Sequence, residues 1–450
     1  MIGSSSRRRR TLVVVALVPV LAVAACSSSK KSTGGSSGGG GGACPAAKGK
    51  VALAFWSWVP GVDKAVALWN KQNPDITVTL KTTPAGNAGT YQNMFNALKA
   101  GTAPDLGQIE YDSLASFRVQ DGLADLSKCG SVSAAKDKFV NWTYSQASFS
   151  NTGLYAIPQD SGPMALYYRK DVFARAGIKT PPATWDEYAA DAQKVKAVGS
   201  QITFFPQGDA NWFTGLLWQN GAQLFKTSGD SWQVAINDPK AKQVADYWQK
   251  LISQKLVATN LQGFSPGLYK AWDSGQVASW ISAAWGYSTI RDNAKASAGK
   301  WAVAPMPQWS AGASSAGNWG GSTTAVFKSS KHQNEAAKFA LWLNTSPDSL
   351  KLLNSLGGLY PAAKDGLNLP SLSQGVPFYG NEKVFDVFKT ASSNVNTSFQ
   401  WGPIMTDTYR FMSDGFSKAL NGGGTLTSTL DDAQAKTVAA MKSQSIKVSG

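Results

Sequence analysis

The chain alternates between strand-like and helix-like segments from residue 51 onward, and this alternation constrains the fold more than any other feature. The strand-like segments are 51–58, 76–81 and 106–111, and the helix-like segments between them are 62–72 and 91–99. A βαβαβ order predicts a mostly parallel sheet covered by helices on both faces, because parallel strands need crossover connections. Ligands of such sheets bind beyond the carboxyl ends of the strands, which here carry Trp58, Glu110 and Asp112.

The alternation continues through the rest of the 450 residues. A chain of this length is too long for one ordinary core and predicts two lobes or domains. Longer helices are expected at 239–253, 334–344 and 430–444. Thr184 and Glu187 have the spacing of a capping box and predict the start of another helix.

Residues 1–25 are typical of an export signal. Arg7 to Arg10 form a positive region, residues 12–23 are apolar, and small residues precede Cys26. The alternative is a transmembrane helix, but the apolar run is shorter than the roughly 20 residues that a bilayer requires. The small residues ending at Cys26 resemble the lipobox of bacterial lipoproteins, which implies export and a lipid anchor on Cys26 at the outer face of the cell membrane. Both the general and the twin-arginine export routes stay open.

Residues 26–47 are rich in glycine and serine and predict a flexible tether. Their glycine run lacks the lysine and hydroxyl residue of a phosphate loop. The net charge of the chain is +15, and it falls to +11 when the four arginines of the signal are removed. The remaining basic residues are scattered and form no nucleic-acid motif, so no nucleic-acid partner is expected.

Three cysteines and one histidine limit the chemistry of the chain. With Cys26 lipidated, Cys44 and Cys129 remain as an even pair in an oxidising compartment and predict a disulfide, with two unpaired thiols as the alternative. A single histidine, His332, cannot form a histidine metal cluster and speaks against Ser-His-Asp or Cys-His catalysis. We expect neither a metal nor a cofactor.

Several motifs follow the tether in a fixed order. They are Pro104-Asp105 with Gly122-Leu123-Ala124-Asp125-Leu126, Gly153-Leu154-Tyr155-Ala156-Ile157-Pro158, residues 166–173, residues 181–187, and Gly320-Gly321-Ser322. Together they resemble the extracellular solute-binding protein family 1, the sugar-binding lipoproteins and periplasmic proteins of ABC importers. The resemblance covers nearly everything after the tether.

The resemblance implies a two-lobed periplasmic-binding-protein fold of the α/β class. Each lobe is expected to contain a mainly parallel sheet flanked by helices, and crossing hinge segments are expected to join the lobes. We expect the first lobe at 48–160 and 320–363, and the second at 161–319 and 364–450. The resemblance also implies a monomer that holds a sugar or oligosaccharide between its lobes and delivers it to the membrane permease of an ABC transporter.

The candidate ligand-binding residues combine aromatic rings with carboxylates, amides and glycines. Sugars stack their apolar C–H faces on aromatic rings and need polar groups for their hydroxyls. The strand ends and the resemblance together indicate Trp58, Glu110, Asp112, Asp160, Gly162, Asp209, Asn211, Trp212, Trp285, Trp319, Gly320, Gly321, Tyr360 and Trp401. Trp285 matches a stacking tryptophan of the family, whereas Asn211 stands where maltose-binding relatives carry an aromatic residue.

Each candidate also has a purely structural interpretation. A tryptophan can be packing, and Asp112 or Asp209 can be a helix N-cap. Strand alternation puts Trp56 and Trp58 on one face. Because Trp56 lies deeper in the strand, we expect it to pack in the core, and we expect Trp58 to contact the ligand.

Two other functions compete with sugar binding. A secreted glycoside hydrolase also has an aromatic cleft with paired carboxylates, but Glu187 and Glu335 have the pattern of helix-surface residues, which leaves no obvious acid and nucleophile. A binding protein for a peptide or a polyamine is the second, and a polyamine would require several clustered carboxylates. The aromatic-rich composition favours a sugar, so we predict a non-enzymatic, lipid-anchored sugar receptor.

Overall fold

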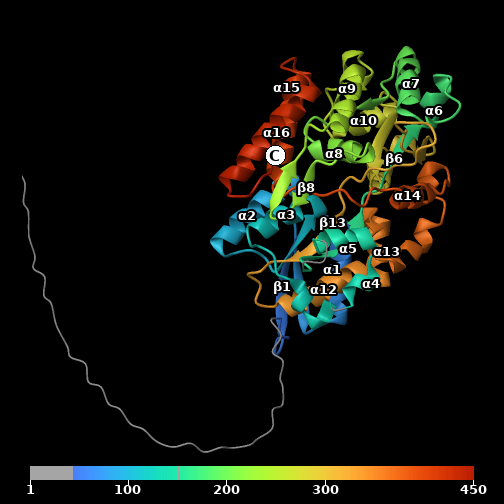
Figure 1. Cartoon of the computed structure of the whole chain (residues 1–450). Coiled ribbons are helices and arrows are strands. Elements are labelled where there is room, and N and C mark those ends of the chain that lie inside the picture. Colours follow the sequence, from blue (N-terminus) through green and yellow to red (C-terminus); the bar gives the residue numbers. More distant parts are fainter. Residues whose placement is uncertain (1–43, 133, 150–152, 450) are drawn as a thin grey trace, which may run out of the picture. The chain divides into compact units, whose positions relative to one another are not determined.

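The computed structural model describes residues 44–132, 134–149 and 153–449, which belong to one compact unit (Figure 1). The predicted signal peptide, the lipidation site Cys26 and most of the predicted tether lie outside the described residues. Within the described part, none of the helices combines the length and the apolar character that a membrane span requires.

The first sheet has the strand order β2-β1-β3-β13-β4. Its strands are β1 (Val51–Ser57), β2 (Ile76–Thr82), β3 (Leu106–Glu110), β4 (Ala156–Pro158) and β13 (Ser322–Val326). β1 pairs in parallel with β2 and β3, which confirms the expected βαβαβ start. β13 runs antiparallel to both of its neighbours, β3 and β4.

The second sheet is an extended one, in which a bridge joins a three-stranded part of order β11-β6-β12 to a two-stranded part of order β10-β7. Its strands are β6 (Met164–Arg169), β7 (Thr203–Phe204), β10 (Val257–Ala258), β11 (Ser279–Ala283) and β12 (Trp301–Pro305). β10 and β7 are parallel, a parallel bridge between Gln201 and Val277 links β7 to β11, and β6 runs antiparallel to both β11 and β12. We call the parts built on the two sheets the first and the second lobe.

Both sheets are therefore mixed, whereas the sequence led us to expect mainly parallel ones. The antiparallel strands have a topological cause. β6 is the strand by which the chain arrives in the second lobe, and β13 is the strand by which it returns to the first. Each enters its sheet from the other lobe without a crossover helix, so it can run against its neighbours.

Helices surround both sheets. Those of the first lobe are α1 (Val62–Gln72), α2 (Thr90–Ala100), α3 (Tyr111–Val119), α4 (Ala135–Lys138), α5 (Asn141–Ala147), α12 (Gln333–Thr345) and α13 (Pro347–Gly357). The others are α6 (Lys170–Arg175), α7 (Trp185–Ala197), α8 (Ala210–Gln219), α9 (Pro239–Ser253), α10 (Pro266–Ser274), α11 (Gly286–Asn293), α14 (Val384–Ser393), α15 (Met405–Leu420) and α16 (Leu426–Ser443). In Figure 1, α6, α7, α9 and α10 lie around β6, and α1 and α12 lie around β1.

Smaller elements complete the fold. They are the hairpin β8 (Phe225–Ser228) and β9 (Ser231–Val234), and seven short 3₁₀ helices at Gly86–Ala88, Leu126–Lys128, Gly130–Val132, Lys295–Ser297, Asp365–Asn368, Pro370–Leu372 and Pro377–Tyr379. The capping box expected at Thr184 and Glu187 is present at the start of α7. α16 begins four residues earlier than expected because Thr425 caps it with a second capping box.

The chain passes between the sheets at the segments that the sequence predicts as hinges. β5 (Asp160–Ser161) pairs with β14 (Tyr360–Pro361), and the Trp319 amide donates to the Gly162 carbonyl at 2.8 Å. A Cβ on Gly162 would lie 1.9 Å from the carbonyl oxygen of Trp319, so only glycine allows these two segments to touch.

The start of the described chain is fastened to the first lobe. A disulfide joins Cys44 to Cys129, 85 residues apart, and the amide of Ala47 donates to Glu335 Oε1 at 3.0 Å. Glu335 is only 3 % exposed, so its expected position on a helix surface is wrong. The N-terminal turn of α12 is covered here by the incoming chain.

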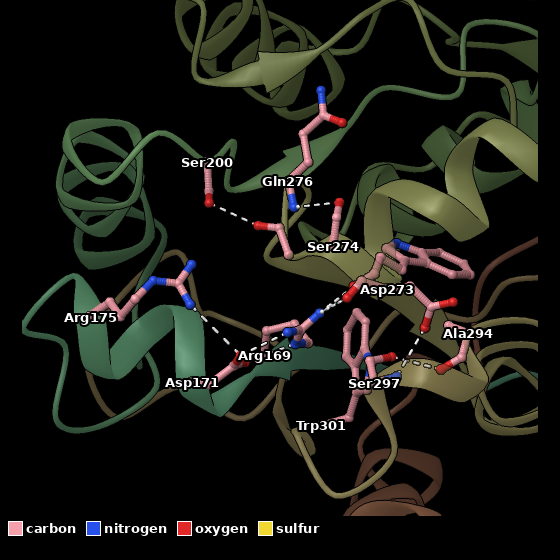
Figure 2. A network of polar contacts seen from close by, with 12 residues as sticks. Arg169, Asp171, Arg175, Ser200, Asp273, Ser274, Gln276, Ala294, Ser297 and Trp301 are labelled. Carbon is pink, nitrogen blue, oxygen red and sulfur yellow. Dashed lines mark hydrogen bonds and ion pairs between the residues drawn. The ribbon is translucent and has the colours of Figure 1, made fainter.

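A buried arginine organises one end of the second sheet (Figure 2). Arg169, the last residue of β6, is 2 % exposed and donates to both oxygens of Asp171 at 2.8 and 2.7 Å. It also donates to the carbonyls of Trp272 and Asp273 on α10. The Trp301 ring lies 5.9 Å away. This network ties β6, α10 and β12 together and pairs the charge of Arg169 with that of Asp171.

Candidate functional site

The candidate site is built from segments that follow the carboxyl ends of strands in both lobes. Glu110 ends β3 and Asp112 lies in the first turn of α3. From the second lobe, Asp209 precedes α8 and Trp285 follows β11. This is the location predicted for ligand-binding groups in an open α/β sheet.

Glu110 is held in place by a tyrosine that the sequence did not point to. Tyr91 Oη donates to Glu110 Oε2 at 3.0 Å, and the Glu110 amide donates to the same hydroxyl at 2.9 Å. The Trp58 ring meets the Tyr91 ring edge to face at 5.8 Å, and the Trp58 amide donates to Gln108 Oε1 at 3.1 Å. Trp58 and Glu110 both contact Tyr91 and thus form one wall of the candidate site.

Asp112 connects the two lobes. Its side chain is 2 % exposed and accepts from Ser113 Oγ and from Asn211 Nδ2, each at 2.8 Å. Asn211 is 7 % exposed, and its Oδ1 has no hydrogen-bond partner among the described residues. The Tyr409 hydroxyl also lies close to Asp112, but in the described part of the chain it lacks the geometry of a full hydrogen bond.

Burial shifts the ionisation of these carboxyl groups. Desolvation raises the pKa of Asp112 to about 6 and that of Asp160 to about 7. Desolvation, with the Asp112 charge as a further cause, raises the pKa of Asp209 to about 6. The pKa of Glu110 is raised by burial and then by the charge of Asp112. In the described part of the chain, none of the four forms a salt bridge with lysine or arginine.

Aromatic residues form the opposite wall. The Trp285 and Trp319 rings meet at 4.6 Å and 62°, and Trp285 Nε1 donates to the Trp319 carbonyl at 3.2 Å. Phe264, which is 49 % exposed, lies 5.9 Å from Trp285 and 6.1 Å from Trp319. Trp319 is only 4 % exposed, so Phe264 and Trp285 offer the apolar ring surface at the edge of the site.

Gly320 joins the aromatic wall to the acidic one. Its φ of 72° is in the left-handed region, which favours glycine. A Cβ there would lie 3.4 Å from Trp285 Nε1 and 3.6 Å from Glu110 Oε1. The next residue, Gly321, has a φ of 93° and packs against the Tyr111 ring. Gly320 therefore keeps a side chain out of the space between the tryptophan and the carboxylate, and Gly321 allows the close approach to Tyr111.

Trp212 does not belong to this site, which corrects our expectation. It is 1 % exposed, its Nε1 donates to the Ile281 carbonyl at 2.9 Å, and its ring packs 5.1 Å from Trp248. The Asp209 side chain accepts from the Trp212 amide at 3.0 Å. Asp209 is thus the N-cap of α8 as well as a neighbour of the other carboxyl groups described above. The capping directs Trp212 into the core.

Three other candidates lie in hinge segments or in a separate cluster. Asp160 accepts from the Ser322 amide at 2.7 Å, and Tyr360 is 4 % exposed in β14. Trp401 donates to Gln146 Oε1 at 2.6 Å and packs against Trp218 at 5.4 Å. The polar groups of Asp160 and Trp401 are thus engaged within the protein.

A cavity of about 520 Å³ lies beside this aromatic cluster. It is lined by Val140, Asn141, Trp142, Ser145, Lys364 and Thr397. The Trp142 ring lies 6.3 Å from both Tyr111 and Trp218. None of the lining residues was a candidate from the sequence.

Trp56 is not a core residue, contrary to our expectation. Val51, Leu53, Phe55 and Ser57 face the buried side of β1, and Trp56 lies on the other side, where it is half-buried. Lys81 Nζ stands 4.1 Å from the Trp56 ring centre. The alternation of the strand was predicted correctly, but the assignment of Trp56 to the buried side was wrong.

The sequence did not point to four residues near the candidate site, Tyr91, Gln108, Phe264 and Tyr409. Tyr91 has the spacing of a core residue on its helix, and Gln108 is an interior strand position. Tyr409 lies in a helix without a motif. Phe264 had a usable signal, because it stands beside the breaker sequence Ser265-Pro266, as many aromatic residues of this chain do.

Known proteins resemble the chain along most of its length. The arabinooligosaccharide-binding protein of Halalkalibacterium halodurans is 26 % identical over 364 residues, which are 78 % of this chain and 80 % of the relative. The galacto-N-biose/lacto-N-biose I-binding protein of the ABC transporter from Bifidobacterium longum, solved with lacto-N-biose, is 29 % identical with a TM-score of 0.81, and the match covers 90 % of this chain and 100 % of that one.

A further solved structure is the ABC transporter associated binding protein from B. animalis subsp. lactis, in complex with beta-1,6-galactobiose. It is 28 % identical with a TM-score of 0.81, and the match covers 89 % of this chain and 100 % of that one. The model of the bacterial extracellular solute-binding protein family matches residues 56–348, well over half of the chain. Together with the two-lobed α/β fold, this match shows that the chain belongs to the bacterial extracellular solute-binding protein family.

Proposed function

We propose that the chain captures a sugar or oligosaccharide between its two lobes and delivers it to the permease of an ABC transporter. The observation that carries this proposal is the meeting of Glu110 and Trp285, from different lobes, at the side-chain-free backbone of Gly320. The sugar-binding relatives and the ABC transporter proteins among the similar structures support it.

The two walls suit the two faces of a sugar ring. Trp58 and Trp285 would stack on its apolar C–H face. Glu110 and Asp112 would accept hydrogen bonds from hydroxyl groups, and the free Oδ1 of Asn211 would accept another. Asp209, Trp319, Gly320 and Gly321 complete the proposed site, while Asp160, Gly162, Tyr360 and Trp401 contribute through the hinge and its neighbourhood.

Capture would proceed by hinge bending. The bond from Asn211 to Asp112 joins the lobes, and opening the hinge would break it and free both groups for a ligand. The Gly162–Trp319 contact lies where the two crossing segments touch. The lobe limits at 48–160 with 320–363, and at 161–319 with 364–450, are part of this proposal.

We further propose a non-enzymatic monomer anchored to the outer face of the cell membrane through a lipid on Cys26. Residues 26–47 would act as the tether. Among the described residues, the side chains that hydrogen-bond Glu110 and Asp112 are those of a tyrosine, a serine and an asparagine, which fits a binding role.

Calorimetric titration with mono- to tetrasaccharides tests the proposal. We expect at least one saccharide to bind, and Trp285→Ala to weaken it by roughly ten- to hundredfold because a stacking surface is lost. Val198→Ala, which removes an exposed side chain of the second lobe, is the control and should bind normally.

Two outcomes would contradict the proposal. Full affinity of the Trp285→Ala variant would remove Trp285 from the site. Release of shorter sugars during prolonged incubation with labelled oligosaccharides would identify a glycoside hydrolase instead.

A further inference from the structure

One buried glutamine hydrogen-bonds both the wall of the candidate site and the strand that returns from the hinge. Gln108, in the middle of β3, is 1 % exposed. Its Oε1 accepts from Ser57 Oγ at 2.6 Å and from the Trp58 amide at 3.1 Å. Its Nε2 donates to Ser322 Oγ at 2.9 Å. The two ends of its carboxamide are therefore engaged in opposite directions, one towards β1 and the other towards β13.

Ser322 lies where the segments that cross between the lobes come together. It begins β13, directly after the crossing at residues 319–321. Its amide donates to Asp160 Oδ1 at 2.7 Å, and β5, which contains Asp160, pairs with β14. Hinge bending changes the geometry of these segments, and Ser322 is bonded to them directly.

The hydrogen bonds form an unbroken path from the wall of the site to the hinge. The path runs from the Trp58 amide through the side chain of Gln108 and through Ser322 to the carboxyl group of Asp160. The last three residues are buried, so water competes little for these bonds. A buried carboxamide needs partners wherever it lies. The partners of this one belong to the two parts of the molecule that act together when a ligand is captured.

We propose that Gln108 is a positioning residue that couples the placement of Trp58 to the state of the hinge. The path holds the backbone of Trp58 at a fixed position relative to Ser322 and Asp160. Contact of a ligand with the Trp58 ring then favours one arrangement of the hinge, and that arrangement in turn sets the position of the ring. This inference rests on the proposed function, because it describes how the proposed sugar site is linked to lobe closure.

Hydrogen exchange tests the path without any ligand. Ser322→Ala removes the acceptor of Gln108 Nε2 and leaves the bond from the Trp58 amide to Gln108 in place. A carboxamide held from one side only should release that amide more often. We therefore expect the hydrogen–deuterium exchange of the Trp58 amide, read by mass spectrometry, to become roughly three- to tenfold faster.

Thr323→Val is the matched control for this experiment. It removes a buried hydroxyl group of the same strand, which donates to the Ile109 carbonyl at 2.7 Å outside the path. The exchange of the Trp58 amide should stay as it is in the unaltered chain.

Calorimetric titration tests the coupling itself. The probe is the tightest-binding sugar among the mono- to tetrasaccharides of glucose, galactose and arabinose. We expect Ser322→Ala to weaken its binding by roughly three- to tenfold, the range for one hydrogen bond. In a Trp58→Ala background the same substitution should cause no further loss, because the ring that the path positions is gone. Thr323→Val should leave the affinity unchanged in both backgrounds.

Two further variants separate positioning from a general loss of stability. Ser322→Thr keeps a hydroxyl group at this place and should restore both the slow exchange and the affinity. Gln108→Met keeps the length of the side chain, removes its hydrogen bonds, and should match or exceed the effects of Ser322→Ala. It replaces Ser322→Ala if that variant does not fold, and urea denaturation of each variant measures its stability.

The outcomes separate this inference from the proposed function. Unchanged exchange of the Trp58 amide in Ser322→Ala, or an equal loss of affinity with and without the Trp58 ring, would overturn the inference and leave the sugar receptor intact. Equal effects of Ser322→Ala and Thr323→Val would also overturn it. Binding of none of the sugars to the unaltered chain would overturn the proposed function and, with it, the coupling to a ligand.

Discussion

The Arg169 network and the acidic cluster treat carboxylates in opposite ways: the network pairs the partly exposed Asp171 with an arginine, and the cluster holds its carboxyl groups without one. The acidic cluster consists of Glu110, Asp112, Asp160 and Asp209. Burial alone would raise the pKa of Asp171, but the hydrogen bonds and charge of Arg169 outweigh it and lower that pKa. Asp112 and Asp209 have no such partner, and burial raises the pKa of both to about 6. A carboxylate that serves the fold is paired within the protein, whereas one kept for a ligand is left incomplete.

Removing Arg169 should have the largest effect. Arg169→Ala leaves Asp171 and the carbonyls of α10 without their donor, so we expect the free energy of unfolding to fall by about 3–5 kcal/mol. Urea denaturation measures this. Arg175→Ala is the matched control, because Arg175 is largely exposed at 3.7 Å from the same carboxylate and should cost under about 1 kcal/mol. Equal losses for both variants would contradict the distinction.

The acidic cluster should make the unliganded protein less stable as the pH rises. Its aspartates have a higher pKa in the folded chain than the value of about 4 that they have when unfolded. The folded state therefore binds more protons, and its stability falls between about pH 4 and pH 7. A rise of the pKa from about 4 to about 6 corresponds to a loss on the order of 3 kcal/mol for Asp112 alone, measured by denaturation across this range.

Two variants separate the cluster from other acidic groups in this pH experiment. Asp112→Asn should flatten the decline, because one of the groups that gains charge is gone. Asp171→Asn should not flatten it, since the pKa of Asp171 is lowered. An unchanged slope in Asp112→Asn would mean that Asp112 is not destabilised by its burial.

The smallest expected effect concerns two buried hydroxyl groups. Tyr188 Oη hydrogen-bonds Ser279 Oγ at 3.0 Å, so Tyr188→Phe should cost about 1 kcal/mol. Tyr409→Phe should cost less than about 0.5 kcal/mol, because its hydroxyl lies near Asp112 but lacks the geometry of a full hydrogen bond in the described part of the chain. Thermal denaturation of both variants checks this. A larger loss in Tyr409→Phe would show that its hydroxyl is already satisfied.

The first half of the first sheet could be predicted from local patterns. Period-two alternation identifies β1 and β2, and helical spacing identifies α1 and α2, because each pattern follows from which side is buried. The antiparallel placement of β6 and β13 could not be predicted this way. It depends on where the chain changes lobes, and no local pattern reports that.

The part of the candidate site that lies at the ends of strands was predictable from the sequence. Glu110, Asp112 and Trp285 lie at or just after the ends of strands in an α/β fold, and Gly320 precedes β13 beside them. Trp212 could not be separated from Trp285 by sequence, because both are tryptophans beside a breaker and only packing distinguishes them. Tyr409 reaches the site through α15, far along the chain, so its part depends on tertiary contacts alone.

The fastening of the chain's start has a mechanical consequence. The Cys44–Cys129 disulfide and the Ala47–Glu335 bond both attach it to the first lobe. A pull transmitted through a lipid-anchored N-terminus would therefore load the first lobe and bypass the hinge. The second lobe would move relative to a first lobe held by the proposed anchor, so that opening and closing need not displace the anchor in the membrane.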